Sequence, residues 1–205
     1  MAERNAESFQ KLYAENPAWE IGRPQKSFVE VADKISGSIL DSGCGTGENA
    51  LFFAKRGNTV TGIDFVDGPI QLAKRKADER HIKSDFYVKD AVELKSVADW
   101  AGRFDCVIDS GLFHVFPNKA RAKYVQGLHF VLKPSGRLFL LCFSDETPGT
   151  EGPRRISRNE LREAFADAWK IDSIQSTTFE VRPEAKKDRF SGEEPKGWFL
   201  IATRR

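Results

Sequence analysis

Cysteine, histidine and methionine are scarce in this chain, and their scarcity excludes several kinds of site. The 205 residues include three cysteines, three histidines and one methionine. Cys44, Cys106 and Cys142 have no CxxC spacing and an odd count, so the sequence predicts neither a disulfide framework nor a structural zinc site. His81 and His129 have no clustered partners, and no metal is expected. Unpaired thiols suit a reducing compartment, and we expect a cytoplasmic protein.

A charge imbalance and a long apolar run are also missing. Lys and Arg total 32 against 30 Asp and Glu, a formal net charge of +2. Nucleic-acid binders usually carry a concentrated basic field, so no nucleic-acid partner is expected. The apolar run 138–143 is far too short to cross a bilayer, and residues 1–17 lack the apolar region of a signal peptide. The sequence therefore predicts no membrane partner, and it leaves the oligomeric state open.

The alternation of apolar and amphipathic segments predicts the fold. Hydrophobic residues make up 40% of the chain, enough for one substantial core, and we expect a single domain over residues 1–205. Short runs rich in Val, Ile and Phe alternate with longer amphipathic stretches, as in a parallel sheet covered by helices. The expected strands are 38–42, 58–64, 85–88, 104–109 and 137–143, and the expected helices between them are 48–56, 69–80 and 119–132.

The last part of the chain departs from this alternation. Ser157 and Glu160 have the spacing of a capping box, which predicts a helix directly after Ser157. Residues 170–181 and 198–203 have the pattern of strands separated by the charged stretch 182–196, and they predict a long antiparallel hairpin. The expected fold class is therefore α/β: a Rossmann-like, doubly wound, mostly parallel seven-stranded sheet with an antiparallel terminal hairpin. Whether the charged stretch orders only on binding is left open.

The strongest local signal is a glycine-rich loop, residues 41–48 (DSGCGTGE), directly after one expected strand and directly before an expected helix. Glycines there let the chain turn sharply and let a ligand approach the backbone at the carboxyl ends of the strands. Glu48 stands where a dinucleotide-binding pattern has its third glycine, and with Asp41 it is expected to repel a pyrophosphate. S-adenosylmethionine, a sulfonium without phosphate, tolerates such carboxylates. The three glycines are Gly43, Gly45 and Gly47.

Two further carboxylates stand at neighbouring strand ends. Asp64 ends the second expected strand, the position from which a carboxylate accepts hydrogen bonds from both ribose hydroxyls. Asp90 follows the third strand, where a carboxylate accepts from an adenine amino group and Ala91 offers a backbone donor. Phe65 is expected to pack against the adenine ring. The ordered set of loop, Asp64 and Asp90 therefore predicts an adenosyl cofactor.

These residues carry a resemblance to a known family. The stretch 39–47, Asp64 and Asp90 resemble the first motif and the ribose and adenine ligands of the class I S-adenosylmethionine-dependent methyltransferases. The resemblance implies S-adenosylmethionine as cofactor and S-adenosylhomocysteine as product. It covers about the first half of the fold.

A finer resemblance extends over nearly the whole chain. The segments 19–25 (WEIGRPQ), 132–136 (LKPSG) and 142–154 are similar to the small-molecule branch near the thiopurine, thiol and halide methyltransferases. That branch folds its front segment over the cofactor. The resemblance therefore implies a small-molecule acceptor and a covering segment on a Rossmann-like core.

The covering segment is expected over residues 1–36 and the core over residues 37–205. By resemblance, Trp19 would contact the methionine end of the cofactor, and Arg23 is assigned to the same site. Simple core packing is the alternative for Trp19, because large aromatic side chains are usually buried. A plain surface cation is the alternative for Arg23.

Methyl transfer from a sulfonium needs an aligned acceptor and a dry site more than it needs a base. Where the acceptor must lose a proton, Asp109 and His114 at the fourth strand end are the candidate catalytic groups, and Asp109 is also assigned to the cofactor site. The alternative for His114 is a histidine that anchors a loop by hydrogen bonding. Phe113, Phe116 and Phe143 are expected to form an apolar acceptor pocket, although aromatic residues there are more often core.

The main hypothesis is a methyltransferase that acts on a sulfur, nitrogen or oxygen atom of an aromatic, heterocyclic or thiol compound. The sequence after the fourth strand lacks the Asn-Pro-Pro-Tyr or Asp-Pro-Pro-Tyr tetrad typical of enzymes that methylate nucleic-acid bases. One alternative is a nicotinamide-dependent oxidoreductase, disfavoured by Glu48 and the missing third glycine. The other is a non-catalytic S-adenosylmethionine-binding module.

Overall fold

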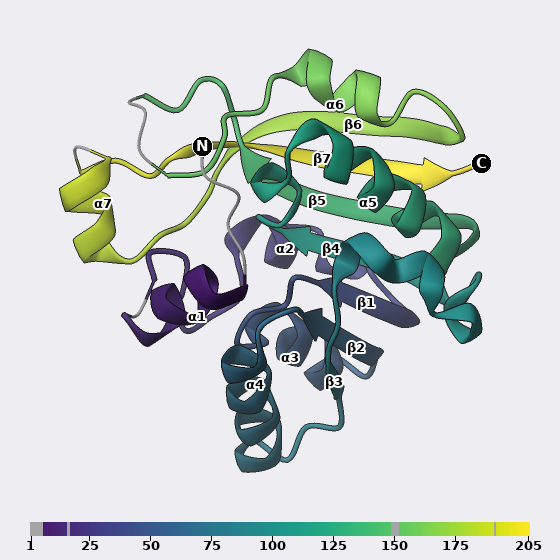
Figure 1. Ribbon diagram of the computed structural model, residues 1–205, viewed down its shortest axis with the longest axis horizontal. Helices are drawn as coiled ribbons and strands as arrows, with labels where there is room; N and C mark the ends of the chain where they lie inside the picture. The colour runs from purple at the N-terminus through teal and green to yellow at the C-terminus, as the bar shows by residue number, and fades with distance from the viewer. Residues whose placement is uncertain (1–5, 16, 149–151, 191) are drawn as a thin grey trace.

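The seven expected strands form one mixed sheet in the order β3-β2-β1-β4-β5-β7-β6 (Figure 1). The strands are β1 (Ser38–Ser42), β2 (Thr59–Asp64), β3 (Asp85–Val88), β4 (Phe104–Ser110), β5 (Leu132–Phe143), β6 (Trp169–Thr178) and β7 (Lys196–Arg204). β1 to β5 pair in parallel, and β7 lies antiparallel between β5 and β6. The expected fold class is confirmed.

The computed structural model describes residues 6–15, 17–148, 152–190 and 192–205. Parts of the expected covering segment, of the stretch 142–154 and of the charged stretch 182–196 therefore lie outside the described residues.

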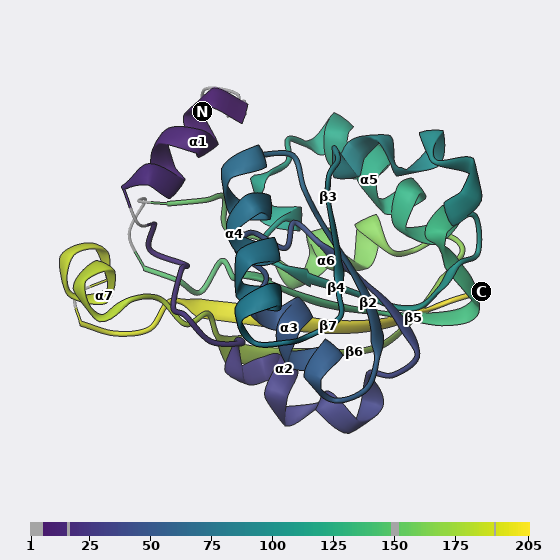
Figure 2. The same cartoon turned by 90° about the horizontal axis from the view of Figure 1, so that it is seen from below.

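Helices cover both faces of the sheet. They are α1 (Ala6–Ala14), α2 (Lys26–Glu30), α3 (Glu48–Lys55), α4 (Asp67–Glu79), α5 (Asn118–Val131), α6 (Arg158–Ala164) and α7 (Pro183–Arg189), with short 3-10 helices at 32–34, 91–96, 98–100 and 113–115. Tyr124 of α5 and Leu161 of α6 belong to one core, whereas Phe28 of α2 and Leu51 of α3 belong to the core on the other face. α1 and α7 lie beyond the end of the sheet where β4 and β5 finish (Figure 1, Figure 2).

β5 shows why the sheet is buried on both faces. Leu138 and Leu140 belong to one core and Phe139 and Leu141 to the other, and all four are completely buried. Because successive side chains of a strand point to opposite faces, a continuous apolar run fits a strand covered by helices on both sides. The strand order reverses between β1 and β4, and the carboxyl ends of these strands border the crevice where open α/β sheets bind ligands.

The structure differs from the expected elements in two places. The strand expected over residues 137–143 begins at Leu132, and its register against β4 shifts between Phe104 and Cys106. The charged stretch 182–196, for which the sequence predicted no helix, contains α7, which begins at Pro183. Proline is favoured at the first helical position because its fixed φ is already helical and its missing N–H has no role there.

The capping box expected at the start of α6 is present. The Ser157 hydroxyl accepts a hydrogen bond from the Glu160 backbone N–H at 3.1 Å, and the Glu160 carboxylate accepts one from the Ser157 N–H at 3.0 Å. We expect Ser157→Ala to lower the free energy of unfolding by about 1 kcal/mol, because the first turn of α6 loses an acceptor. Urea unfolding measures this loss. The exposed strand variant Ser176→Ala serves as control, and equal losses in both variants would refute the role of the cap.

Candidate functional site

The glycine loop between β1 and α3 is held close to its neighbours. Gly43, Gly45 and Gly47 have φ values of 74°, 52° and 85°, a region that side chains with a Cβ rarely adopt. The Gly45 N–H donates to Asp64 Oδ2 at 3.1 Å. A Cβ built on Gly45 would lie 2.8 Å from the Tyr13 hydroxyl. Both the backbone conformation and the close approach of neighbours therefore require glycine here.

Asp64 ends β2 beside this loop, as predicted. Its second oxygen, Oδ1, accepts from the Val66 N–H at 3.0 Å. Burial raises the pKa of Asp64 to about 6, and hydrogen bonds from the backbone of Val66, Gly45 and Phe65 limit the rise. Backbone donors on both oxygens fix the orientation of the carboxylate, and each oxygen retains a further lone pair. Asp64 can therefore accept from the two hydroxyls of a ribose.

The next strand end provides the residues expected to bind adenine. Asp90 is exposed at the end of β3, and its Oδ1 accepts from the Val92 N–H at 2.8 Å, while Ala91 is buried. A carboxylate accepts several hydrogen bonds, so this contact leaves capacity for an adenine amino group. Phe65 lies edge-on to Phe9 of α1, with ring centroids 5.4 Å apart. The geometry is compatible with the expected adenine site.

Three buried carboxylates lie near the carboxyl ends of adjacent strands: Asp41 on β1, Asp64 on β2 and Asp109 on β4. In the described part of the chain, neither oxygen of Asp41 has a hydrogen-bond partner. Burial raises the pKa of Asp41 to about 8, and the nearby charges of Asp109 and Asp64 add to the rise. An unpartnered buried carboxylate is unfavourable unless a cation compensates it. The sulfonium and ammonium of S-adenosylmethionine fit this requirement.

Asp109 organises the turn that follows β4. Its oxygens accept from the Leu112 N–H at 2.7 Å, the Phe113 N–H at 3.0 Å and the Tyr124 hydroxyl at 2.9 Å. Burial raises the pKa of Asp109 to about 7, and these donors limit the rise. The side chain is completely buried. Its expected contact with cofactor or acceptor stays a prediction, while its structural role in the turn is evident.

His114 lies in an aromatic cluster at the carboxyl ends of β4 and β5, formed with Phe143, Phe179 and Phe190. The centroids of Phe143 and Phe179 lie 5.1 Å and 5.7 Å from that of His114, and Phe190 lies 5.9 Å from Phe143. The Phe143 N–H donates to His114 Nδ1 at 3.0 Å. Because Nδ1 accepts, the neutral ring carries its proton on Nε2. His114 thus makes an anchoring hydrogen bond of the kind that the sequence left open, and its expected catalytic role stays a prediction.

The structure does not bring Phe113 and Phe116 to this cluster. Phe113 is completely buried in the core on the α5 face and stacks on Phe165 at 5.7 Å. Phe116 packs on Tyr124 at 5.0 Å. Phe143 belongs to the opposite core. The tight 3-10 turn after β4 directs neighbouring side chains to different sides, so the expected three-ring pocket does not assemble.

Phe179 and Phe190, rather than Phe113 and Phe116, pack against Phe143, and the sequence reasoning did not single them out. Phe179 follows β6 and Phe190 follows α7, and both are buried. The signal that could have identified them is an aromatic residue on each side of the charged run 180–189 (EVRPEAKKDR). Such a residue indicates that the segment packs back onto the protein.

The front segment closes over the glycine loop. The Tyr13 ring lies edge-on to Trp19 with centroids 5.8 Å apart, and Phe9 lies 6.3 Å from Trp19. Burial raises the pKa of Tyr13 well above its usual value, and the nearby charge of Asp64 adds to this. Because the Tyr13 hydroxyl already lies against Gly45, a ligand that rests on Gly45 must displace this side chain.

Arg23 is paired with a residue far along the sequence. Its guanidinium donates to both oxygens of Glu180, at 3.0 Å and 2.8 Å. Gln25 adds two hydrogen bonds to the Glu180 backbone, at 2.8 Å and 2.9 Å. These contacts join the front segment to the chain that follows β6. The expected contact of Arg23 with the cofactor stays a prediction.

Glu48 does not act as the sequence indicated. Lys76 Nζ lies 2.8 Å from its carboxylate, and Arg80 donates to both of its oxygens at 2.9 Å and 3.0 Å. Burial alone would raise the pKa of Glu48, but the hydrogen bonds from Arg80 and Lys76 bring it below its usual value. A neutralised Glu48 does not repel a pyrophosphate. The sequence argument against a nicotinamide cofactor therefore depends on the missing third glycine.

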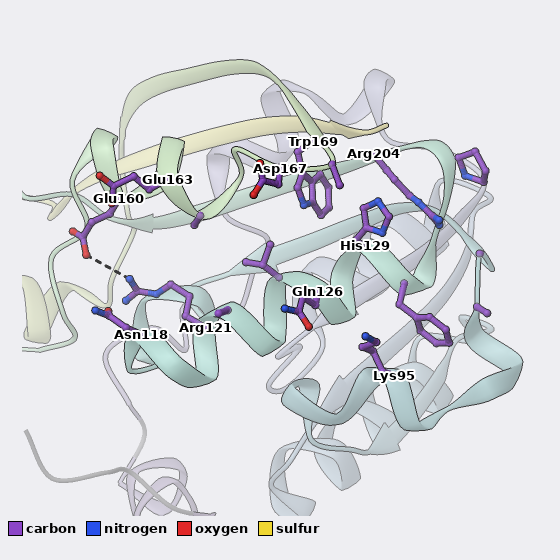
Figure 3. Close-up of a pocket in the computed structure, with 18 residues that line it drawn as sticks. Lys95, Asn118, Arg121, Gln126, His129, Glu160, Glu163, Asp167, Trp169 and Arg204 are labelled. Atoms are coloured by element: carbon purple, nitrogen blue, oxygen red, sulfur yellow. Dashed lines mark hydrogen bonds and ion pairs between the residues drawn. The ribbon is translucent and has the colours of Figure 1, made fainter.

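An open groove of about 900 Å³ lies between α5 and α6 (Figure 3). Asn118, Arg121 and Glu160 line one end, and His129 and Trp169 line the other. The described residues around it include none from the glycine loop, from the ends of β2 and β3 or from the aromatic cluster. The groove is therefore separate from the candidate site.

The described ranges contain no helix long and apolar enough to cross a membrane. In the same residues, no group of three or more His, Cys, Asp and Glu side chains is arranged to hold a metal ion. Cys44, Cys106 and Cys142 are free thiols.

The chain is similar to several known proteins. A family model described as a methyltransferase domain matches residues 39–136. The 2-heptyl-1-hydroxyquinolin-4(1H)-one methyltransferase of Mycobacteroides abscessus is 33% identical over 199 residues, which cover 92% of this chain and 87% of that protein. A solved structure described as the conversion of a disulfide bond into a thioacetal group during echinomycin biosynthesis is 32% identical, with a TM-score of 0.84 over 98% of this chain and 93% of that one.

A further solved structure supports the fold. The 1,6-didemethyltoxoflavin-N1-methyltransferase of Burkholderia thailandensis, with bound 1,6-didemethyltoxoflavin and S-adenosylhomocysteine, has a TM-score of 0.74 at 22% identity, over 97% of this chain and 86% of that one. The finer resemblance to thiopurine, thiol and halide methyltransferases is not confirmed by these relatives and stays a prediction. With S-adenosylmethionine as its cofactor, the chain is an enzyme that belongs to the class I S-adenosylmethionine-dependent methyltransferases.

Proposed function

We propose that the enzyme methylates a small aromatic or heterocyclic molecule, at an oxygen, nitrogen or sulfur atom, which binds at the aromatic cluster of His114, Phe143, Phe179 and Phe190. The observation that carries the proposal is the cluster itself. Three phenyl rings and one imidazole, all at most 6% exposed, gather at the carboxyl ends of β4 and β5. Such rings favour flat ligands, and an imidazole adds a polar group that fixes the orientation of a ligand.

The cluster lies next to the cofactor site through the turn after β4. A Cβ built on Gly43 of the glycine loop would lie 2.9 Å from Leu112, and one built on Gly111 would lie 3.0 Å from Phe179. The two residues Gly111 and Leu112 therefore touch the aromatic cluster on one side and the glycine loop on the other. This adjacency supports transfer of a methyl group between ligands of the two sites.

One relative supports the chemical class of the acceptor. The methyltransferase of Mycobacteroides abscessus is named for a hydroxyquinolinone, a flat heterocycle with a hydroxyl group. An acceptor of this kind fits a cluster of aromatic side chains better than an aliphatic thiol does.

S-adenosylmethionine, when bound, supplies an electrophilic methyl group on its sulfonium. The residues of the chain have three tasks: Asp64, Asp90 and the loop bind the cofactor, the segment 1–36 covers it over the core 37–205, and the cluster aligns the acceptor. With its proton on Nε2, His114 donates a hydrogen bond to the acceptor rather than taking its proton. An acceptor that ionises near neutral pH loses its proton to water, so it needs a group that orients it but no general base from the protein.

A comparison of acceptors tests the proposal. Purified protein is incubated with S-adenosylmethionine and either 2-heptyl-1-hydroxyquinolin-4(1H)-one, a flat thiophenol or an aliphatic thiol, and S-adenosylhomocysteine formation is measured. We expect turnover with at least one of the flat acceptors and little with the aliphatic thiol. Turnover with the aliphatic thiol alone would contradict the proposal.

Two variants of His114 separate anchoring from chemistry. His114→Phe removes both nitrogens, whereas His114→Asn keeps an acceptor for the Phe143 N–H but has no counterpart of Nε2. We expect both to lower kcat/KM for the acceptor by about tenfold to a hundredfold, since a hydrogen bond to the reacting group is lost, with S-adenosylmethionine affinity unchanged. Steady-state kinetics measure the effect. His129→Phe, on the far face, is the control, and full activity in His114→Asn would limit His114 to anchoring.

A further inference from the structure

The side chain of Thr46 connects the glycine loop with the front segment. Thr46 lies between Gly45 and Gly47 and is 4% exposed. Its hydroxyl donates to Glu20 Oε2 at 2.7 Å and accepts from Lys76 Nζ of α4 at 2.7 Å. Glu20 directly follows Trp19, the residue expected at the methionine end of the cofactor. One hydroxyl thus joins three elements around the candidate cofactor site.

The charges around Thr46 form a balanced set. Lys76 Nζ lies 2.8 Å from Glu48 and 3.7 Å from Glu20, and Arg80 pairs with Glu48. The side chains of Lys76, Glu48 and Glu20 are 16%, 10% and 20% exposed, so water screens them little. Two cations therefore compensate two carboxylates. We refer to Glu20, Thr46, Glu48, Lys76 and Arg80 as the Glu20 network.

The Glu20 network is one of two attachments that hold the front segment against the rest of the protein. The other attachment of this segment is the pairing of Arg23 and Gln25 with Glu180. In the sequence, Trp19 lies between α1 and Arg23. The next residue, Glu20, accepts a hydrogen bond from Thr46 and so attaches the backbone beside Trp19 to the glycine loop. Glu20, Lys76 and Arg80 are not among the groups assigned to the ribose, the adenine or the acceptor.

We propose that Glu20, Thr46 and Lys76 are positioning residues that hold the front segment on the glycine loop and thereby set the affinity for S-adenosylmethionine. Lys76 is the central charge, because its removal leaves the Glu20 and Glu48 carboxylates facing each other with Arg80 as the remaining cation. Their repulsion displaces Glu20, and with it Trp19, from the loop. The inference depends on the cofactor site and not on the identity of the acceptor.

Calorimetric titration of the full chain with S-adenosylmethionine, and separately with S-adenosylhomocysteine, tests the inference without any acceptor. We expect Glu20→Gln and Lys76→Met each to raise Kd about tenfold, because Glu20→Gln removes the negative charge that faces Lys76 and Lys76→Met removes the cationic donor to Thr46. The double variant is expected to raise Kd by about the same factor as one change, since both break one network. Lys76→Arg, which keeps the charge, is expected to bind within about threefold of the parent.

Asp33→Asn is the matched control, because it removes an exposed ion pair with Arg56 at the opposite end of β1. Hydrogen exchange of residues 17–24 in the cofactor-free protein distinguishes positioning from general stability: we expect faster exchange there in Glu20→Gln and Lys76→Met, with the strands unchanged. An unchanged Kd, a double variant with multiplied effects, or uniformly faster exchange over the whole chain would overturn the inference. None of these outcomes depends on the acceptor proposal, which the acceptor comparison tests separately.

Discussion

Asp64→Ala is expected to weaken S-adenosylmethionine binding by about a hundredfold or more. A carboxylate that accepts from two ribose hydroxyls makes two hydrogen bonds to a charged group, each worth about 1.5–3 kcal/mol, and about 1.4 kcal/mol corresponds to tenfold in Kd. The same change removes the acceptor of the Gly45 N–H, which holds the glycine loop in place. Calorimetric titration with S-adenosylmethionine measures the loss directly.

Two further variants separate ribose binding from loop support. Asp64→Asn keeps one oxygen that can still accept from a backbone N–H and is expected to lose less affinity than Asp64→Ala. Asp67→Ala removes an exposed carboxylate three residues later, at the start of α4, and is expected to bind like the parent. Thermal unfolding of all three shows whether the fold is intact. An Asp64→Ala protein that is folded and binds within threefold of the parent would refute the assignment.

The residues that the sequence assigns to the cofactor lie at neighbouring strand ends in the structure, as expected, because their sequence signals are local. The glycine loop, Asp64 and Asp90 each stand directly after a strand, and parallel strands place their carboxyl ends at one edge of the sheet. The order of the motifs along the chain is therefore also their order in space. Short apolar runs that end in glycine or aspartate contain this information without any tertiary contact.

The aromatic cluster proposed for the acceptor could not be predicted in the same way, because Phe179 and Phe190 come from the chain after β6. The pairing of Arg23 with Glu180, over a separation of 157 residues, was not foreseen either. No periodicity links residues so far apart. Even for His114, whose place at the end of β4 was expected, the tautomer depends on the Phe143 N–H of a different strand. The direction of the Phe113 side chain, in the tight turn after β4, likewise depends on tertiary packing, because the ring is buried in the core on the α5 face.

Charge compensation was the other limit of sequence reasoning. Glu48 looks like a free carboxylate at the start of α3, and its partners Lys76 and Arg80 are on α4. Their spacing of four residues places both on one side of that helix, but a single sequence does not show which helix they face. Asp41 departs from the expectation for a different reason: burial raises its pKa to about 8, so near neutral pH the carboxyl group is mostly protonated in the cofactor-free protein.

Asp41→Asn is expected to stabilise the cofactor-free protein at pH 8 while it weakens S-adenosylmethionine binding. The pKa of Asp41 is raised to about 8 in the fold, against about 3.9 in the unfolded chain. A raised pKa in a carboxyl group means that its contribution to stability is fully present below pH about 4 and is lost as the pH rises through about 8. Between pH 5.5 and 8 this loss is about 3 kcal/mol for Asp41, and the variant avoids it.

Urea unfolding at pH 5.5 and pH 8 measures this difference. The parent is expected to be less stable at pH 8, and Asp41→Asn to show a flatter dependence. Asp64 and Asp109, with pKa values of about 6 and about 7, add to the same trend and remain in the variant. Paired carboxylates such as Glu180 have lowered pKa values and lose their contribution only at more acidic pH. The control Asp33→Asn is expected to keep the full pH dependence of the parent.

Binding of a cation beside Asp41 is expected to offset the loss of folding stability that ionisation of this carboxyl group causes. A positive charge lowers the pKa of the carboxyl, so S-adenosylmethionine binding at pH 7 is expected to release a proton, and the affinity is expected to rise with pH up to about 8. Titrations at pH 7 in two buffers of different ionisation enthalpy count the protons. In Asp41→Asn the release is expected to decrease and the affinity to fall about tenfold or more. If Asp41→Asn released as many protons as the parent, another group would be the source of the proton. The Asp41 carboxylate would then lower the stability of the free protein without a function in cofactor binding, which would contradict the assignment.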